Sequence, residues 1–211
     1  MQRAHHKAII LCLLIHGFLS ISLYAQGDSL QWNSMDERIF SSYLELGYVG
    51  EISEQLEGGR LIKSAFEFRL RGSNHLFFRA NYDEYSSSYR TDLLDKPKIV
   101  LDNHANISDA ILGLGYRFGK NNYRLFMLGQ AGLKFYSLPA ILSEVKPEVL
   151  YMEDGFSIPT SRLTVGIEYY LDSSFALSLE IFQNSVWEKK DYWKNRFASF
   201  GISIGLQGTF F

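Results

Sequence analysis

Polar and apolar residues alternate along most of this chain, and the alternation is clearest in its last fifteen residues, Phe197–Phe211. One set of alternate positions there carries Phe200, Ile202, Ile204, Leu206 and Phe210, whereas the other carries serine, glycine, glutamine and threonine. Successive side chains of a β-strand leave opposite faces, so this pattern predicts a strand. Its length favours a membrane-spanning barrel strand of about 9–11 residues over an ordinary strand of about 5–6.

Seven earlier segments repeat the design, which gives eight predicted strands. They are Ile39–Gly50, Leu61–Gly72, His75–Asp83, Ile107–Phe118, Tyr123–Tyr136, Arg162–Leu171, Phe175–Val186 and Phe197–Phe211. The connections alternate between long loops and tight turns, the turns being marked by glycine, serine, asparagine and aspartate. Four long loops at one end, with three tight turns and both termini at the other, predict an all-β fold: an eight-stranded antiparallel up-and-down transmembrane β-barrel.

Alternation alone does not say which face of the barrel is outside. The apolar face carries no charged residue within the predicted strands, and Arg60, Glu84 and Arg196 share its parity only at the loop ends. Glycine gathers on the polar face, where we expect it to make room for long arginine and glutamate side chains inside a narrow barrel. Aromatic residues bracket the strands at both ends, as in membrane barrels. The alternative is a secreted, soluble, lipocalin-like barrel that binds an apolar ligand.

The N-terminus predicts export. Arg3 and Lys7 precede an apolar run that ends in Tyr24-Ala25-Gln26, the pattern of a cleaved secretory signal peptide. We therefore expect residues 1–25 to be the signal peptide, 26–38 a short periplasmic lead-in and 39–211 the barrel. Cleavage would remove the only cysteine, Cys12, and leave 19 basic against 23 acidic side chains, a net charge of −4. That balance argues against nucleic-acid binding.

Strand count, loop asymmetry and the aromatic C-terminus make residues 39–211 similar to two groups of membrane barrels. The chain resembles the small eight-stranded outer-membrane barrels of the OmpX, OmpA and OmpW type, and the porin-family barrels that include PorT-like proteins. The resemblance implies a location in the Gram-negative outer membrane and recognition by the barrel-assembly machinery. Phe210 has the lipid-facing parity expected of a terminal aromatic residue, whereas the last residue, Phe211, has the opposite parity.

The polar face of the predicted strands is nearly balanced in charge. Its members are Lys63, Arg69, Arg71, Arg79, Arg117, Arg124, Lys134 and Arg162 against Glu45, Glu67, Asp83, Asp109, Glu168 and Glu180. An eight-stranded barrel has a lumen just wide enough for side chains to fill. We therefore predict a plug of paired charges formed by Glu45, Lys63, Glu67, Arg69, Arg79, Lys134, Glu168 and Glu180. The alternative for these charges is a path for protons or ions.

We expect no catalytic residues, no cofactor and no metal site, since two histidines and no cysteine would remain after export. The enzymatic alternative is a lipid A-modifying barrel of the PagL or PagP type. Its only candidate residues are Asp102, His104, Ser108 and Asp109, at the start of the fourth strand.

The expected partners follow from the predicted location. They are outer-membrane lipid and lipopolysaccharide, the barrel-assembly machinery and, as an open alternative, a secretion or surface protein bound by the long loops. We expect a structural or surface-interaction role, and a monomer.

Overall fold

The computed structural model describes residues 40–52, 56–70, 75–88, 98–100, 104–119, 122–137, 141–143, 150–151, 155–187 and 198–210. The chain divides into two units, Met1–Met35 and Asp36–Phe211, and every described residue belongs to the second unit. The predicted signal peptide and lead-in, and the terminal Phe211, lie outside the described residues. Within the described part, no helix is long and apolar enough to cross a membrane.

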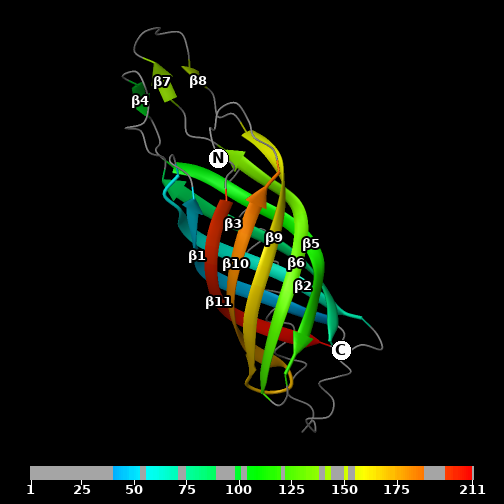
Figure 1. Cartoon of the computed structure of the whole chain (residues 1–211). Helices are drawn as coiled ribbons and strands as arrows, with labels where there is room; N and C mark the ends of the chain where they lie inside the picture. Colours follow the sequence, from blue (N-terminus) through cyan, green and yellow to red (C-terminus); the bar gives the residue numbers. More distant parts are fainter. Residues whose placement is uncertain are drawn as a thin grey trace. The chain divides into compact units, whose positions relative to one another are not determined.

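Eight long strands close into a barrel (Figure 1). They are β1 (Phe40–Ile52), β2 (Gly59–Arg69), β3 (Leu76–Ser88), β5 (His104–Phe118), β6 (Tyr123–Ser137), β9 (Gly155–Tyr170), β10 (Phe175–Val186) and β11 (Ala198–Phe210). Each long strand pairs antiparallel with the next long strand in the sequence, and β1 pairs with β11 to close the ring. The prediction of an eight-stranded antiparallel up-and-down barrel is confirmed.

The register fixes the tilt of the strands. The row of paired residues that starts at Leu46 reaches β5 at Ser108 through β2 and β3. Followed the other way round, through β11, β10, β9 and β6, the same row reaches β5 at Phe118. The ring therefore closes with a displacement of ten residues, and eight strands with this shear tilt by about 43°. Because of this tilt, a row of paired residues comes closer to the long-loop end, measured along the barrel axis, as it passes from β1 through β2 and β3 to β5.

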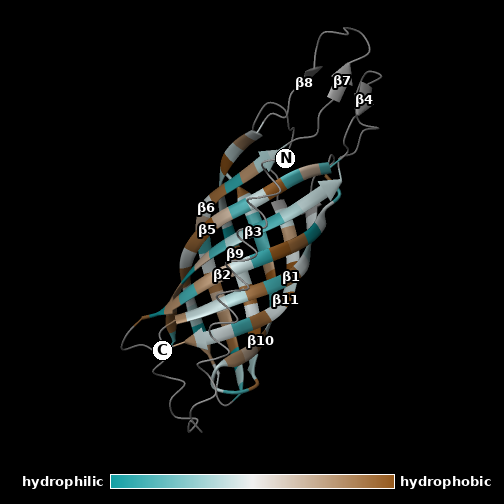
Figure 2. Ribbon diagram, turned by 180° about the vertical axis from the view of Figure 1, so that it is seen from behind, coloured by the Kyte–Doolittle hydropathy of each residue, from teal (hydrophilic) through white to brown (hydrophobic). Residues whose placement is uncertain are grey.

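Hydrophilic and hydrophobic residues alternate along the long strands (Figure 2), and their burial shows that the two faces of the wall differ. Charged and polar side chains such as Glu45 and Arg79 point inward and are fully buried, whereas Leu46, Leu114 and Ile204 point outward and are about 60% exposed. A soluble lipocalin-like barrel would have the opposite arrangement, so the geometry contradicts that alternative. Arg60 and Glu84 lie within β2 and β3 instead of beyond the strands, but both stay close to the long-loop end.

Most of the long strands extend further on the long-loop side than the sequence pattern predicts. β3 continues past Asp83 to Ser88, and β9 begins at Gly155 instead of Arg162. Proline is unusual inside a strand, yet Pro159 lies within β9. The last residue pair between β9 and β10 is Thr160 with Val186, and Pro159 comes just beyond it. The missing N–H of the proline therefore removes no bond between these strands.

Three short strands fall within the predicted long loops. β4 (Lys98–Val100), from the β3–β5 connection, pairs with β7 (Ile141–Ser143), which pairs with β8 (Leu150–Tyr151) from the same β6–β9 connection. Two loops that are far apart in the sequence therefore share one small sheet. The alternation of the long strands gave no signal for it.

Candidate functional site

Most of the predicted interior charges form one buried network, which we name the first ion network. Its members are Glu45, Lys63, Glu67, Arg69, Arg79, Arg117, Glu168 and Glu180. Four carboxylates face four cations, so the network is neutral when every group is ionised. Because it spans six of the eight strands, its contacts tie together walls that share no backbone hydrogen bonds.

Two arginines occupy the centre of this network. Arg79 donates to Glu67 at 2.8 Å through Nη2 and to Glu180 at 2.5 Å through Nη1. Arg117 donates to both Glu67 and Glu168 at 2.7 Å. Glu67 is therefore held by two guanidinium groups, an arrangement that compensates the loss of water around a buried carboxylate.

Lysine and hydroxyl groups complete the first ion network at mid-wall. Lys63 donates to Glu45 at 2.8 Å and also pairs with Glu180, which links it to Arg79. Glu45 accepts two further hydrogen bonds, from Ser178 at 2.7 Å and Ser203 at 2.6 Å. A buried carboxylate with three donors around it has little free hydrogen-bonding capacity left for a ligand.

A smaller second ion network lies closer to the long-loop end. Arg162 pairs with Asp83 and donates to Asp109 at 2.8 Å, and Lys134 approaches Asp109 at 3.3 Å. Lys134 also donates to the Tyr85 hydroxyl at 2.7 Å. Two carboxylates and two cations again balance.

The structure divides the predicted set between the two networks. Seven of the eight predicted residues belong to the first network and Lys134 belongs to the second. Arg117, Arg162, Asp83 and Asp109 were placed on the inner face by parity but were left out of the predicted set. Charge balance gave no signal for them, because the predicted set already held four carboxylates and four cations. Which inward charges meet depends on the register across strands, which places Arg117 between Glu67 and Glu168.

Three inward glycines form a recurring unit with a phenylalanine and a cation. Gly115, Gly166 and Gly201 pair across strands with Phe77, Phe126 and Phe182. A Cβ at any of the three glycines would strike the facing ring, so each ring lies flat against its glycine. Guanidinium groups cover the rings: Arg117 lies 4.5 Å from the centre of Phe77, Arg79 4.6 Å from Phe126 and Arg162 4.4 Å from Phe182.

These stacks correct one expectation. The inward glycines were expected to make room for arginine and glutamate side chains, but only Gly205, beside Glu45, does so directly. At the three stacked positions the glycine makes room for a phenylalanine ring, and the ring then presents its negative face to the cation.

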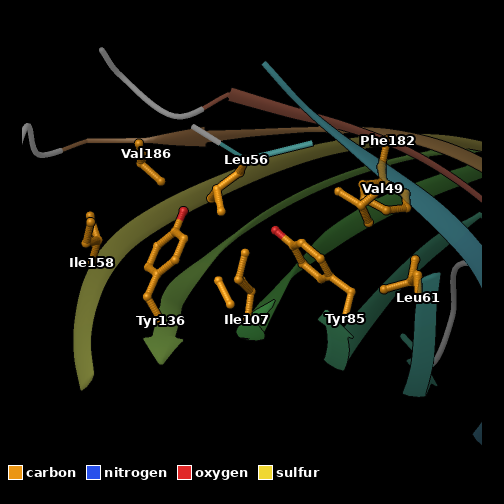
Figure 3. Packing of buried hydrophobic residues seen from close by; sticks show 10 residues of the cluster. Val49, Leu56, Leu61, Tyr85, Ile107, Tyr136, Ile158, Phe182 and Val186 are labelled. Atoms are coloured by element: carbon orange, nitrogen blue, oxygen red, sulfur yellow. The ribbon is translucent and has the colours of Figure 1, made fainter. Parts of the chain in front are cut away.

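The long-loop end of the lumen is apolar, which the sequence analysis did not predict. Val49, Leu61, Tyr85, Ile107, Tyr136, Ile158, Phe182 and Val186 pack there with Ala105 and with Leu56, which lies between β1 and β2 (Figure 3). Leu56 is 1% exposed. The segment that carries it is fixed by bonds from Glu57 N to Ser88 O at 3.0 Å and from Gly58 N to the Ser87 hydroxyl at 3.0 Å. Gly58 has a φ of 94°, a conformation that suits glycine.

Of the residues of the enzymatic alternative, the three that the structure describes are not brought together. Ser108 and Asp109 are neighbours on β5 and therefore point to opposite faces. Asp109 is buried in the second ion network, whereas His104 is exposed on the outer face, four residues from Ser108. Asp102 lies outside the described residues. Among the described residues, no group of three or more His, Cys, Asp or Glu is placed to hold a metal ion.

Comparison with solved structures identifies the fold. Neisserial surface protein A matches with a TM-score of 0.59 at 12% identity, over 81% of this chain and 97% of that protein. The outer membrane protein OprG from Pseudomonas aeruginosa matches with a TM-score of 0.50 at 11% identity, over 82% of this chain and 96% of that protein. The fold is that of the small outer-membrane β-barrels. No protein-family model and no curated protein sequence matches the chain.

Proposed function

We propose that this protein is an outer-membrane barrel with a closed lumen, which serves as a rigid scaffold for its long surface loops. The observation that carries the proposal is the pair of buried, individually neutral ion networks across the lumen. A water-filled pore would leave such groups hydrated, whereas here the four carboxylates of the first network are fully buried. The apolar cluster at the long-loop end adds a second closure, because ions do not cross a dry apolar layer.

The outward face supports membrane insertion. A continuous set of exposed leucine, isoleucine, valine and phenylalanine side chains covers the outer wall. Aromatic residues lie at the tight-turn end, with Phe40, Tyr116 and Tyr169 among them, and Trp187 lies at the long-loop end. Such a surface is costly in water and matches a bilayer between two aromatic girdles.

Conductance in planar lipid bilayers tests the closed lumen. We expect the folded protein, whose insertion is verified by heat-modifiable mobility on gels, to show no steady channels. A double variant, Arg79→Ala with Arg117→Ala, removes both central guanidinium groups and should show intermittent conductance if it still inserts. Steady channels of sizeable conductance in the unaltered protein would contradict the proposal.

The scaffold role is tested separately, at the cell surface. Replacing residues 188–197 by a flexible Gly/Ser segment of equal length should abolish capture of a surface or secretion partner from gently solubilised membranes, while leaving heat-modifiable mobility unchanged. A matched replacement of residues 171–174, at the opposite end of the barrel, is the control and should leave capture intact. If both replacements and the unaltered chain capture the same proteins, the loops are not the binding surface.

A further inference from the structure

The outer wall of the barrel is not uniformly convex, because a groove of about 720 Å³ interrupts it across β3, β5, β6, β9 and β10. Its floor is formed by two small outward residues of β6, Gly129 and Ala131. Its sides include Phe78, Leu114 and Leu163. The groove is open along its outer side.

Gly129 is unusual among the glycines of this wall. The inward glycines have a steric reason, since a Cβ at Gly113 or Gly132 would meet the backbone of the neighbouring strand. At Gly129 no atom lies within 4 Å of an added Cβ. Glycine weakens a strand and contributes no apolar surface, so packing within the protein does not account for it.

The groove changes from apolar to polar along its length. One row of paired residues runs through Phe78, Leu114, Gly129, Leu163 and Gln183, and the next outward row through Leu112, Ala131, Ser161 and Ser185. Both rows begin with apolar residues on β5 or β3 and end with polar side chains on β10. The Gln183 carboxamide is exposed and makes no hydrogen bond within the described part of the chain, and Ser161 accepts one from Trp187 at 3.0 Å.

The tilt of the strands directs the polar end toward the long loops. A row that passes from β3 to β10 climbs by roughly 13 Å over its four steps. That rise is close to the roughly 15 Å thickness of one hydrocarbon leaflet. The groove therefore climbs obliquely toward the long loops, moving about as far around the barrel as it rises, and Gln183 and Ser185 lie at its higher end.

We propose that this groove binds an acyl chain of lipid A, the membrane-embedded part of lipopolysaccharide. This inference rests on the proposed outer-membrane location with the long loops outside, since the polar end then faces the lipopolysaccharide leaflet. The chain lies over Gly129 and Ala131 between Leu114 and Leu163. Its amide, ester or hydroxyl group meets the Gln183 carboxamide and the Ser185 hydroxyl, which offer both donors and acceptors.

Native mass spectrometry of the full-length protein, titrated with purified lipid A in detergent, tests the site. Gly129→Leu fills the floor of the groove from a Cβ position with no atom within 4 Å, and Gln183→Leu removes the polar contact while keeping the wall apolar. We expect the unaltered protein to retain one lipid A molecule, Gln183→Leu to weaken retention at least fivefold and Gly129→Leu to abolish it.

Gly50→Leu is the matched control. Gly50 also faces outward, its nearest atom to an added Cβ is Phe200 O at 3.8 Å, and β1 lies opposite β6 in the ring. Retention unchanged by Gly129→Leu, or reduced equally by Gly50→Leu, overturns the inference. Equal retention of phosphatidylethanolamine with the same dependence on Gly129 also overturns it, since the site would then select any diacyl lipid. Heat-modifiable mobility and fractionation test the outer-membrane location independently of lipid binding. A wrong location can therefore be distinguished from a wrong lipid site.

Discussion

The two ends of the lumen are filled by different kinds of packing. Toward the tight turns, the first ion network holds the walls together through charge, with Arg79 and Arg117 shared among three carboxylates. At the long-loop end, the same walls are joined by apolar packing around Ile107 and Leu56. Removing one partner of a buried ion pair leaves an uncompensated charge, whereas removing a buried apolar side chain costs its transfer free energy and that of the cavity it leaves. The two ends should therefore respond differently to single substitutions.

The largest expected effect is at the centre of the first ion network. Arg79→Met leaves Glu67 and Glu180 without one of their cations, and we expect a loss of about 3–5 kcal/mol in the free energy of unfolding. Urea unfolding in lipid vesicles measures it. Arg79→Lys keeps the positive charge but replaces the branched guanidinium group by a single ammonium group, and its loss in free energy of unfolding should be smaller. Equal losses for both variants would mean that packing against Tyr43 and Phe126, and not charge, is what Arg79 contributes.

At the apolar end, Ile107→Ala should lower the free energy of unfolding by about 2–4 kcal/mol, because it removes buried methyl groups and leaves a cavity. The same unfolding experiment, run at low and at high salt, checks that this loss is apolar in origin. The loss in free energy of unfolding caused by Ile107→Ala should not change with salt concentration. A salt-dependent loss would mean that the substitution acts through charges and not through apolar packing.

The glycine–phenylalanine stacks combine both kinds of packing, because each buried ring also has a guanidinium group over its face. Gly115→Ala forces the Phe77 ring away from the wall and disturbs the cation above it, with an expected loss of about 1–3 kcal/mol. Gly129→Ala is the control, because its added methyl group meets open space and should be neutral or slightly stabilising. Similar effects at the two glycines would show that strand propensity, and not the ring, decides the outcome.

The smallest expected effect is at Tyr85, which belongs to both regions: its ring packs in the apolar cluster and its hydroxyl accepts from Lys134. Tyr85→Phe keeps the ring and removes one hydrogen bond, with an expected loss of about 1–2 kcal/mol. The double variant, Tyr85→Phe with Lys134→Met, should lose less free energy of unfolding than the sum of the two single variants, because the two groups bond to each other. Strict additivity of the two substitutions would contradict the pairing.

Much of the barrel was predictable because period-two alternation records which side of a wall each residue faces. The alternation assigned Glu45, Arg79 and Glu168 to the inside and Leu46 and Ile204 to the outside without any knowledge of the partners. The strand ends were predicted less well. β9 reaches back to Gly155 because β6 is available to pair with it, a fact absent from the local sequence.

The sequence by itself determined the strand count, the up-and-down order and the two faces, since each depends on local periodicity and loop length. Only the tertiary structure decided which charges meet. The shear of ten residues sets the heights at which side chains of distant strands face one another, and so brings Arg117 to Glu67 and Arg162 to Asp83. The groove over Gly129 also exists only in the closed barrel, because five strands must lie side by side before their small residues form one floor.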